Sequence, residues 1–101
     1  MELDIKRTVS GDKGVVAVSG EVDVSNADAL KEAVAAYLKD DAVHAIEVDL
    51  SQVPYIDSTG IGVLVGGLHR AEEAGKRLVA TGVQPNVARI FGMLGVDGII
   101  A

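Results

Sequence analysis

Cysteine is absent from this sequence, and aromatic residues are scarce. Without cysteine the chain can form no disulfide, no thiolate metal site and no cysteine nucleophile. The aromatic residues are too few to build a base-stacking platform or an aromatic ligand cage: Tyr37, Tyr55 and Phe91. Since 49% of the residues are hydrophobic, we expect a core built from aliphatic side chains.

Basic residues are also few, 9 against 15 acidic residues, and the formal net charge is −6. A chain with this balance repels phosphate backbones and anionic lipid, so we expect neither nucleic acid nor a membrane surface as a partner. Residues 1–4 lack the basic and apolar segments of a signal peptide, and no apolar run is long enough to span a bilayer. These absences predict a cytoplasmic protein.

The length of 101 residues predicts a single domain, residues 1–101. Short apolar or alternating runs predict strands, the first two of which are joined by a Gly/Asp turn as in a hairpin. These runs cover residues 3–9, 15–18, 46–50 and 77–81, and one more strand is expected to start at residues 98–100.

Helical spacing of apolar residues predicts three helices between these strands. We expect Ser25 to cap the first helix with Asp28 three residues later, the second to begin at Ser58, and Pro85 to lie in the first turn of the third. The element order is therefore β-β-α-β-α-β-α-β. This order predicts an α/β fold with a mixed sheet of four to five strands and helices mainly on one face.

Residues 57–62, with the sequence DSTGIG, lie where a predicted strand ends and a helix begins. Ser58 is predicted at the capping position, where its oxygen accepts a backbone N–H and faces the positive end of the helix dipole. Gly60 and Gly62 leave the first turn bare, so another protein surface could approach it closely. A phosphate on Ser58 would add about −1.5 to −2 charges at a natural anion site. Taken alone, however, a serine in this position is more often only a helix cap.

The residues around Ser58 favour a function beyond capping of the helix. Residues 57–64, DSTGIGVL, resemble the signature of the STAS domain, the fold of anti-sigma factor antagonists. The resemblance extends over nearly the whole chain. Residues 20–23 (GEVD) are similar to the family's acidic loop, residues 48–51 (VDLS) to the strand before the signature, and residues 88–96 to its Leu/Ile-rich helix.

This resemblance implies that Ser58 is phosphorylated by an anti-sigma factor that is itself a serine kinase. In the family, the unphosphorylated form binds the kinase and frees the sigma factor, phosphorylation abolishes binding, and a serine phosphatase resets the switch. For Asp23, capping of a turn explains the residue almost as well as partner binding does. The resemblance implies a partner-binding surface formed by Asp23, Asp57, Ser58, Thr59, Gly60, Ile61 and Gly62.

In one respect the sequence departs from the family. The family usually continues past its last strand into a C-terminal helix, whereas this sequence ends at Ala101. We therefore expect some apolar surface to be left uncovered, and the oligomeric state stays open.

Other kinds of chemistry have little support in the sequence. Ser58 has no evident histidine base with an orienting carboxylate, so we predict no catalytic residue and no enzyme. His44 and His69 lie in no ligand-spaced cluster, and we predict no metal site and no cofactor. The glycines after Ser58 lack the spacing of a dinucleotide fingerprint.

Two other functions stay open at this point. One is a STAS-like accessory subunit of a transporter or of a lipid-transport complex, without phosphorylation. The other is a small nucleotide-binding domain. The serine at position 58, with Asp57 before it and Thr59 after it, favours the signalling function over both.

Overall fold

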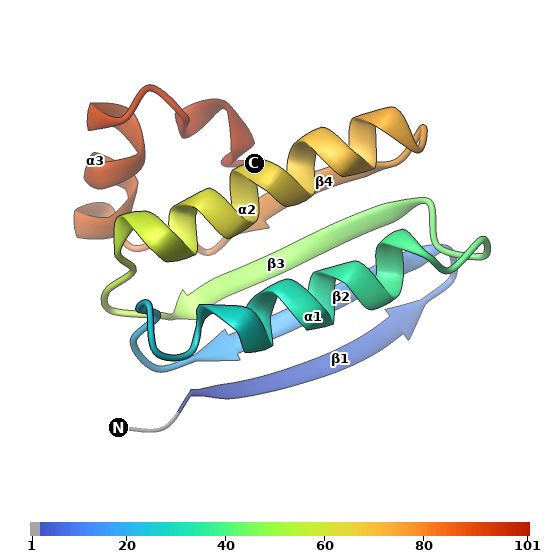
Figure 1. The fold of residues 1–101 in the computed structure, drawn as a ribbon, viewed down its shortest axis with the longest axis horizontal. Helices are drawn as coiled ribbons and strands as arrows, with labels where there is room; N and C mark the ends of the chain where they lie inside the picture. Colours follow the sequence, from blue (N-terminus) through green and yellow to red (C-terminus); the bar gives the residue numbers. More distant parts are fainter. Residues whose placement is uncertain (1–2) are drawn as a thin grey trace.

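The computed structural model describes residues 3–101, which form a four-stranded sheet with its helices mainly on one face (Figure 1). The strands are β1 (Asp4–Ser10), β2 (Lys13–Ser19), β3 (Ala45–Gln52) and β4 (Arg77–Thr81). The helices are α1 (Ala27–Leu38), α2 (Ser58–Glu73) and α3 (Pro85–Met93), and a short 3-10 helix, η1 (Asp97–Ile99), follows them. The predicted α/β fold with a mixed sheet is confirmed.

The strands lie side by side in chain order, β1-β2-β3-β4. β1 and β2 form the predicted antiparallel hairpin, whereas β2, β3 and β4 are parallel. Parallel neighbours need a crossover, which α1 and α2 supply, and crossovers of this kind are right-handed. Because both crossovers step in the same direction along the sheet, α1 and α2 pack on the same face of it (Figure 1).

The core lies between this face of the sheet and the two helices. In β3, the side chains of Ile46, Val48 and Leu50 are buried, while Glu47 and Asp49 point to the opposite, partly exposed face. Leu30 of α1 and Leu64 of α2 cover the buried side, so the core is aliphatic as expected. The largest fully buried side chain, Phe91, comes from α3.

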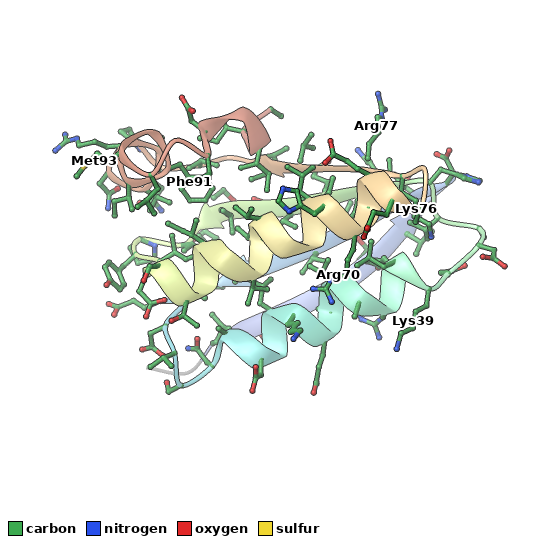
Figure 2. The ribbon with its side chains drawn as sticks, turned by 45° about the horizontal axis from the view of Figure 1, so that its top comes forward. Lys39, Arg70, Lys76, Arg77, Phe91 and Met93 are labelled. Carbon is green, nitrogen blue, oxygen red and sulfur yellow. The ribbon has the colours of Figure 1, made fainter. Side chains whose placement is uncertain are left out.

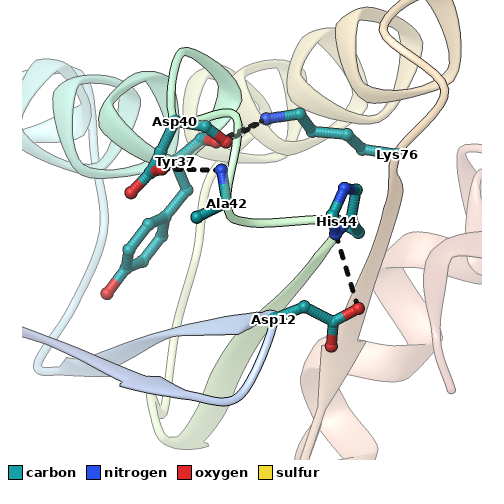
Figure 3. A network of polar contacts seen from close by, with 6 residues as sticks. All are labelled: Asp12, Tyr37, Asp40, Ala42, His44 and Lys76. Atoms are coloured by element: carbon teal, nitrogen blue, oxygen red, sulfur yellow. Dashed lines mark hydrogen bonds and ion pairs between the residues drawn. The ribbon is translucent and has the colours of Figure 1, made fainter.

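One charged side chain is buried among the described residues, Lys76 in the connection between α2 and β4. Its ammonium group donates to the main-chain carbonyl oxygens of Tyr37 at 3.0 Å and of Asp40 at 2.7 Å (Figure 3). The last carbonyl groups of a helix have no partner within it. Lys76 therefore closes the C-terminal end of α1.

The first helix begins later than predicted, at Ala27, and the expected capping pair of Ser25 and Asp28 was wrong. The Ser25 hydroxyl donates to the carboxylate of Asp23 instead, two residues before it. The residue at the cap position is Asn26, whose side-chain oxygen accepts the backbone N–H of Asp23 at 2.9 Å. The nearby Asp23 carboxylate thus competes successfully for the serine hydroxyl.

The final strand was also mispredicted. Residues 97–99 form η1, which buries Ile99 in the core, and Ile100 alone pairs with Ala80 of β4. The backbone N–H of Ala101 donates to the carbonyl oxygen of Ala80 at 2.9 Å. An open apolar groove lies between α2 and this segment, lined by Val65, Leu68, Val96 and Ile99 among others.

Candidate functional site

The candidate site lies at the edge of the sheet where β2 and β3 end. Because carboxyl ends of parallel strands meet at the same edge, the loop after β2 and the segment after β3 become neighbours. The backbone N–H of Val22 donates to the carbonyl oxygen of Tyr55, and that of Asp57 donates to the carbonyl oxygen of Val22, both at 3.0 Å. These bonds bring the acidic loop, residues 21–26, beside Ser58.

Asp57, not Ser58, caps α2. Its backbone is extended, and its carboxylate Oδ1 accepts the backbone N–H of Gly60 at 3.0 Å. Ser58 is the first residue of the helix and is exposed. The prediction of a helix start at this point is confirmed, but the cap was placed one residue too late. The hydroxyl of Ser58 is therefore not consumed by the cap.

The second oxygen of the Asp57 carboxylate, Oδ2, accepts the backbone N–H of Val24 at 3.2 Å. A single side chain thus links the first turn of α2 to the acidic loop. Both bonds run from N–H donors to a carboxylate, which makes them stronger than bonds between neutral groups. Asp57 therefore holds the loop at a fixed distance from Ser58.

Within the acidic loop, the carboxylate of Asp23 accepts the backbone N–H of Ser25 at 2.9 Å as well as the Ser25 hydroxyl. These bonds, the one from the hydroxyl foremost, hold the pKa of the Asp23 carboxyl below its usual range. The side chain of Asn26 closes the loop by donating to the carbonyl oxygen of Glu21 at 2.9 Å. Asp23 is part of the site's architecture, bonded within its own loop.

The other predicted site residues divide into exposed and buried ones. Thr59 and Gly62 are exposed beside Ser58, whereas Gly60 and Ile61 are buried. A Cβ atom on Gly60 would lie 2.7 Å from side-chain atoms of both Ile56 and Val22. Gly60 therefore permits close packing of the helix start against the core, and the surface offered to another protein is formed by its neighbours.

Sequence reasoning missed two exposed apolar side chains at this site. Val24 is 75% exposed in the acidic loop, and Tyr55 is 44% exposed just before Asp57. The available signal was an apolar residue at the centre of a polar loop sequence, EVDVSN. Together with Ser58, these side chains give the site an apolar character beside its acidic groups.

Charge is distributed unevenly along the molecule. Residues 20–30 and 51–63 contain four acidic residues and no lysine or arginine: Glu21, Asp23, Asp28 and Asp57. Figure 2 shows Lys39, Lys76 and Arg77 far from Met93 of α3, although α3 itself carries Arg89. The two segments that meet beside Ser58 are therefore acidic.

The histidines lie away from this site. His44 faces Asp12, with 3.5 Å between Nδ1 and Oδ2, beside the hairpin turn (Figure 3). His69 is exposed near the C-terminal end of α2. Residues 3–101 contain no group of three His, Cys, Asp or Glu side chains suited to holding a metal ion.

Comparison with known proteins agrees with this geometry. A family described as "Mlab, STAS domain" matches residues 5–101. The anti-sigma-B factor antagonist of Staphylococcus epidermidis is 33% identical over 100 residues, which cover 99% of this chain and 92% of that protein. The chain belongs to the STAS-domain family of anti-sigma factor antagonists.

Solved structures of this family have the same fold. An anti-sigma factor antagonist from Mycobacterium paratuberculosis superposes with a TM-score of 0.85 at 25% identity, covering 98% of this chain and 83% of the other. The antagonist SpoIIAA in its unphosphorylated form gives a TM-score of 0.82 at 19% identity, covering 99% and 86%. SpoIIAA has also been solved in a phosphorylated form. Among the described residues, no helix of this STAS domain has the length and apolar character needed to cross a bilayer.

Proposed function

We propose that this protein is a phosphorylation-controlled anti-sigma factor antagonist. In its unmodified form it binds an anti-sigma factor that is also a serine kinase, and the sigma factor is released. Phosphorylation of Ser58 ends the binding, and a serine phosphatase restores it. The observation that carries the proposal is the exposed Ser58 hydroxyl at the start of α2, left free because Asp57 caps the helix.

The local physics explains how such a switch works. A neutral hydroxyl on a bare helix start can be covered by another protein at little cost. A phosphate adds about −1.5 to −2 charges, and burying an uncompensated charge costs several kcal/mol. A kinase also brings the phosphates of its nucleotide to the acceptor hydroxyl, so phosphorylated Ser58 faces like charge. The carboxylates of Asp23 and Asp57 belong to the same small surface, so a phosphate on Ser58 also meets like charge within this chain.

The relatives support this function over the alternatives. The curated relative cited above, matched over nearly its full length, is named an anti-sigma-B factor antagonist. The alternative of an accessory subunit of a transporter or of a lipid-transport complex draws only on the word "Mlab" in the family description and on a likeness of fold to two transporter proteins at 20% identity or less. Such a subunit needs no phosphorylation, so modification of Ser58 separates the two functions.

The remaining expectations belong to the same proposal. The protein acts by binding and not by catalysis, because His69 lies near the far end of α2 and His44 faces Asp12. It works in the cytoplasm, where sigma factors and their regulators meet, without a metal or an organic cofactor. Direct partners are an anti-sigma factor kinase and a serine phosphatase, with no nucleic acid and no membrane.

The test uses the anti-sigma factor of the host organism, captured from an extract by the unmodified chain, identified and purified. The two proteins are incubated with ATP, and phosphorylated residues are mapped by mass spectrometry. We expect phosphate on Ser58, its loss in Ser58→Ala, and normal labelling in Thr59→Ala and Ser25→Ala. Phosphate on Thr59 instead, or no phosphate at all, contradicts the proposal.

A further inference from the structure

Val24 and Tyr55 are exposed apolar side chains on the two segments that meet beside Ser58. Single exposed apolar residues are common on protein surfaces and need no explanation by themselves. Here, however, both segments are hydrogen-bonded to each other through Val22, and Val24 is bonded to the residue before Ser58. The two side chains are therefore carried by adjoining segments beside Ser58.

The backbone that carries Val24 is held in place on both sides. Its own N–H is bound by Asp57, the preceding Asp23 N–H is bound by Asn26, and the following Ser25 N–H is bound by Asp23. A loop with this many bonds loses little conformational freedom when a partner binds. The side chain of Val24 is thus presented outward in a preorganised position, with 75% of it exposed.

We propose that Val24 is the apolar anchor of the partner-binding surface, inserted into an apolar pocket on the anti-sigma factor. The pocket is edged by basic side chains, because the two segments that carry the anchor contain Glu21, Asp23 and Asp57 and no lysine or arginine. Apolar anchors enclosed by a polar rim are typical centres of binding energy. This inference rests on the proposed function and names what the partner recognises besides the serine.

Besides Tyr55, which lies on the same two segments as Val24, the described residues offer a competing anchor at the end of α3, the pair Met93 and Leu94, which are 78% and 52% exposed. The first turn of α3 contacts the segment before Ser58, since the Asn86 side chain donates to the carbonyl oxygen of Pro54 at 2.8 Å. Met93 lies about 10 Å further along that helix at 1.5 Å per residue. Val24, by contrast, is bonded directly to Asp57, the residue before Ser58.

The experiment is a calorimetric titration of the purified anti-sigma factor, loaded with ADP, into wild type, Val24→Ser and Val9→Ser. Val9 is a matched control because it is also exposed, at 58%, but pairs with Gly14 at the opposite end of β2. Full burial of a valine side chain corresponds to roughly a tenfold to hundredfold change in affinity. We expect a loss of that size for Val24→Ser and unchanged binding for Val9→Ser.

Equal binding by Val24→Ser and wild type overturns the inference, as does a loss of affinity in Met93→Ser without one in Val24→Ser.

The affinity of the wild type should also fall as NaCl rises from about 0.05 M to about 0.5 M, because exposed charges are then screened. If the affinity does not change with salt concentration, the proposal of basic side chains around the partner's pocket is contradicted. Ser58→Asp in the same titration distinguishes the proposed function from the proposed Val24 anchor. If it abolishes binding while Val24→Ser does not, the proposed function stands and the anchor fails.

Discussion

The carboxylate of Asp57 accepts the backbone N–H of Gly60 at 3.0 Å, so the residue before the candidate phosphorylation site, and not the site itself, caps α2. The same carboxylate binds Val24 N–H. Structural support and the candidate phosphorylation site are thereby divided between two adjacent residues. Ser58 is free to change its charge without removing the cap of the helix that carries it.

This division predicts unequal costs for two alanine variants. Asp57→Ala removes the cap and should lower the free energy of unfolding by about 1 kcal/mol, within a range of about 0.5 to 2. Ser58→Ala removes an exposed hydroxyl and should change it by less than about 0.5 kcal/mol. Urea unfolding of both variants measures the difference. An equal loss of unfolding free energy in the two variants would contradict the assignment of the cap to Asp57.

The glycines of the same turn should respond in opposite ways. Gly60→Ala places a methyl group 2.7 Å from Ile56 and Val22, and overpacking of this kind costs about 1–3 kcal/mol. Gly62→Ala meets no heavy atom within 4 Å and gains helix propensity, up to about 1 kcal/mol. Thermal unfolding should therefore show a lower Tm for the first variant and an equal or higher Tm for the second. Two variants of equal stability would contradict the close packing at Gly60.

Lys76 should matter for stability and not for partner binding. Lys76→Met keeps most of the side chain's volume but leaves the carbonyl oxygens of Tyr37 and Asp40 without their ammonium donor. Each carbonyl oxygen keeps one main-chain donor, Asp40 N–H for Tyr37 and Val43 N–H for Asp40. Hydrogen bonds to a charged group contribute about 1.5–3 kcal/mol, so we expect a loss of that order in urea unfolding. Lys39→Met, an exposed change at the same end of the molecule, is the control (Figure 2). Equal stability of the two variants would rule out the closing role of Lys76.

Glu47 lies on the helix-free face of the sheet and should stabilise the protein in a pH-dependent way. Its carboxylate accepts hydrogen bonds from Lys13 at 3.0 Å and from Thr81 at 2.9 Å, and these bonds hold its pKa below the usual 4.5. A lowered pKa in the folded state adds stability that is present above pH 4.5 and is lost as the pH falls through the folded value.

The unfolding free energy of the wild type should therefore fall more steeply below pH 4.5 than that of Glu47→Gln. Urea unfolding at a series of acidic pH values measures both slopes, and Glu73→Gln at the exposed end of α2 is the control. Identical slopes for wild type and Glu47→Gln would show that the interaction with Lys13 contributes nothing to folding.

The fold was largely predictable because its signals are local and redundant. Alternation of Ile46, Val48 and Leu50 with polar residues predicted β3, and the burial pattern follows it residue by residue. The helix at Ser58 and the helix beginning with Pro85 start where their sequence signals indicate. Two parallel strands flanking a helical pattern then leave few alternative topologies.

The details of the site were less predictable because neighbouring residues compete for the same bond. Aspartate and serine are equally good caps, and the sequence does not show that Asp57 also binds the backbone N–H of Val24, a distant part of the chain. Ser25 was misassigned for the same reason, since the Asp23 carboxylate takes its hydroxyl. The final strand was mispredicted because residues 97–99 form η1, which buries Ile99 in the core, and a short apolar run does not distinguish this arrangement from a strand.

The central claim is that binding depends on the charge at position 58, and one titration of wild type, Ser58→Ala and Ser58→Asp against the purified anti-sigma factor tests it. A carboxylate in the first turn of α2 interacts favourably with the helix dipole, so Ser58→Asp should fold at least as stably as Ser58→Ala. In the interface the same charge costs several kcal/mol, and every 1.4 kcal/mol is about tenfold in affinity. We therefore predict near-normal binding by Ser58→Ala and a loss of two or more orders of magnitude by Ser58→Asp. Equal binding by all three proteins would contradict the account.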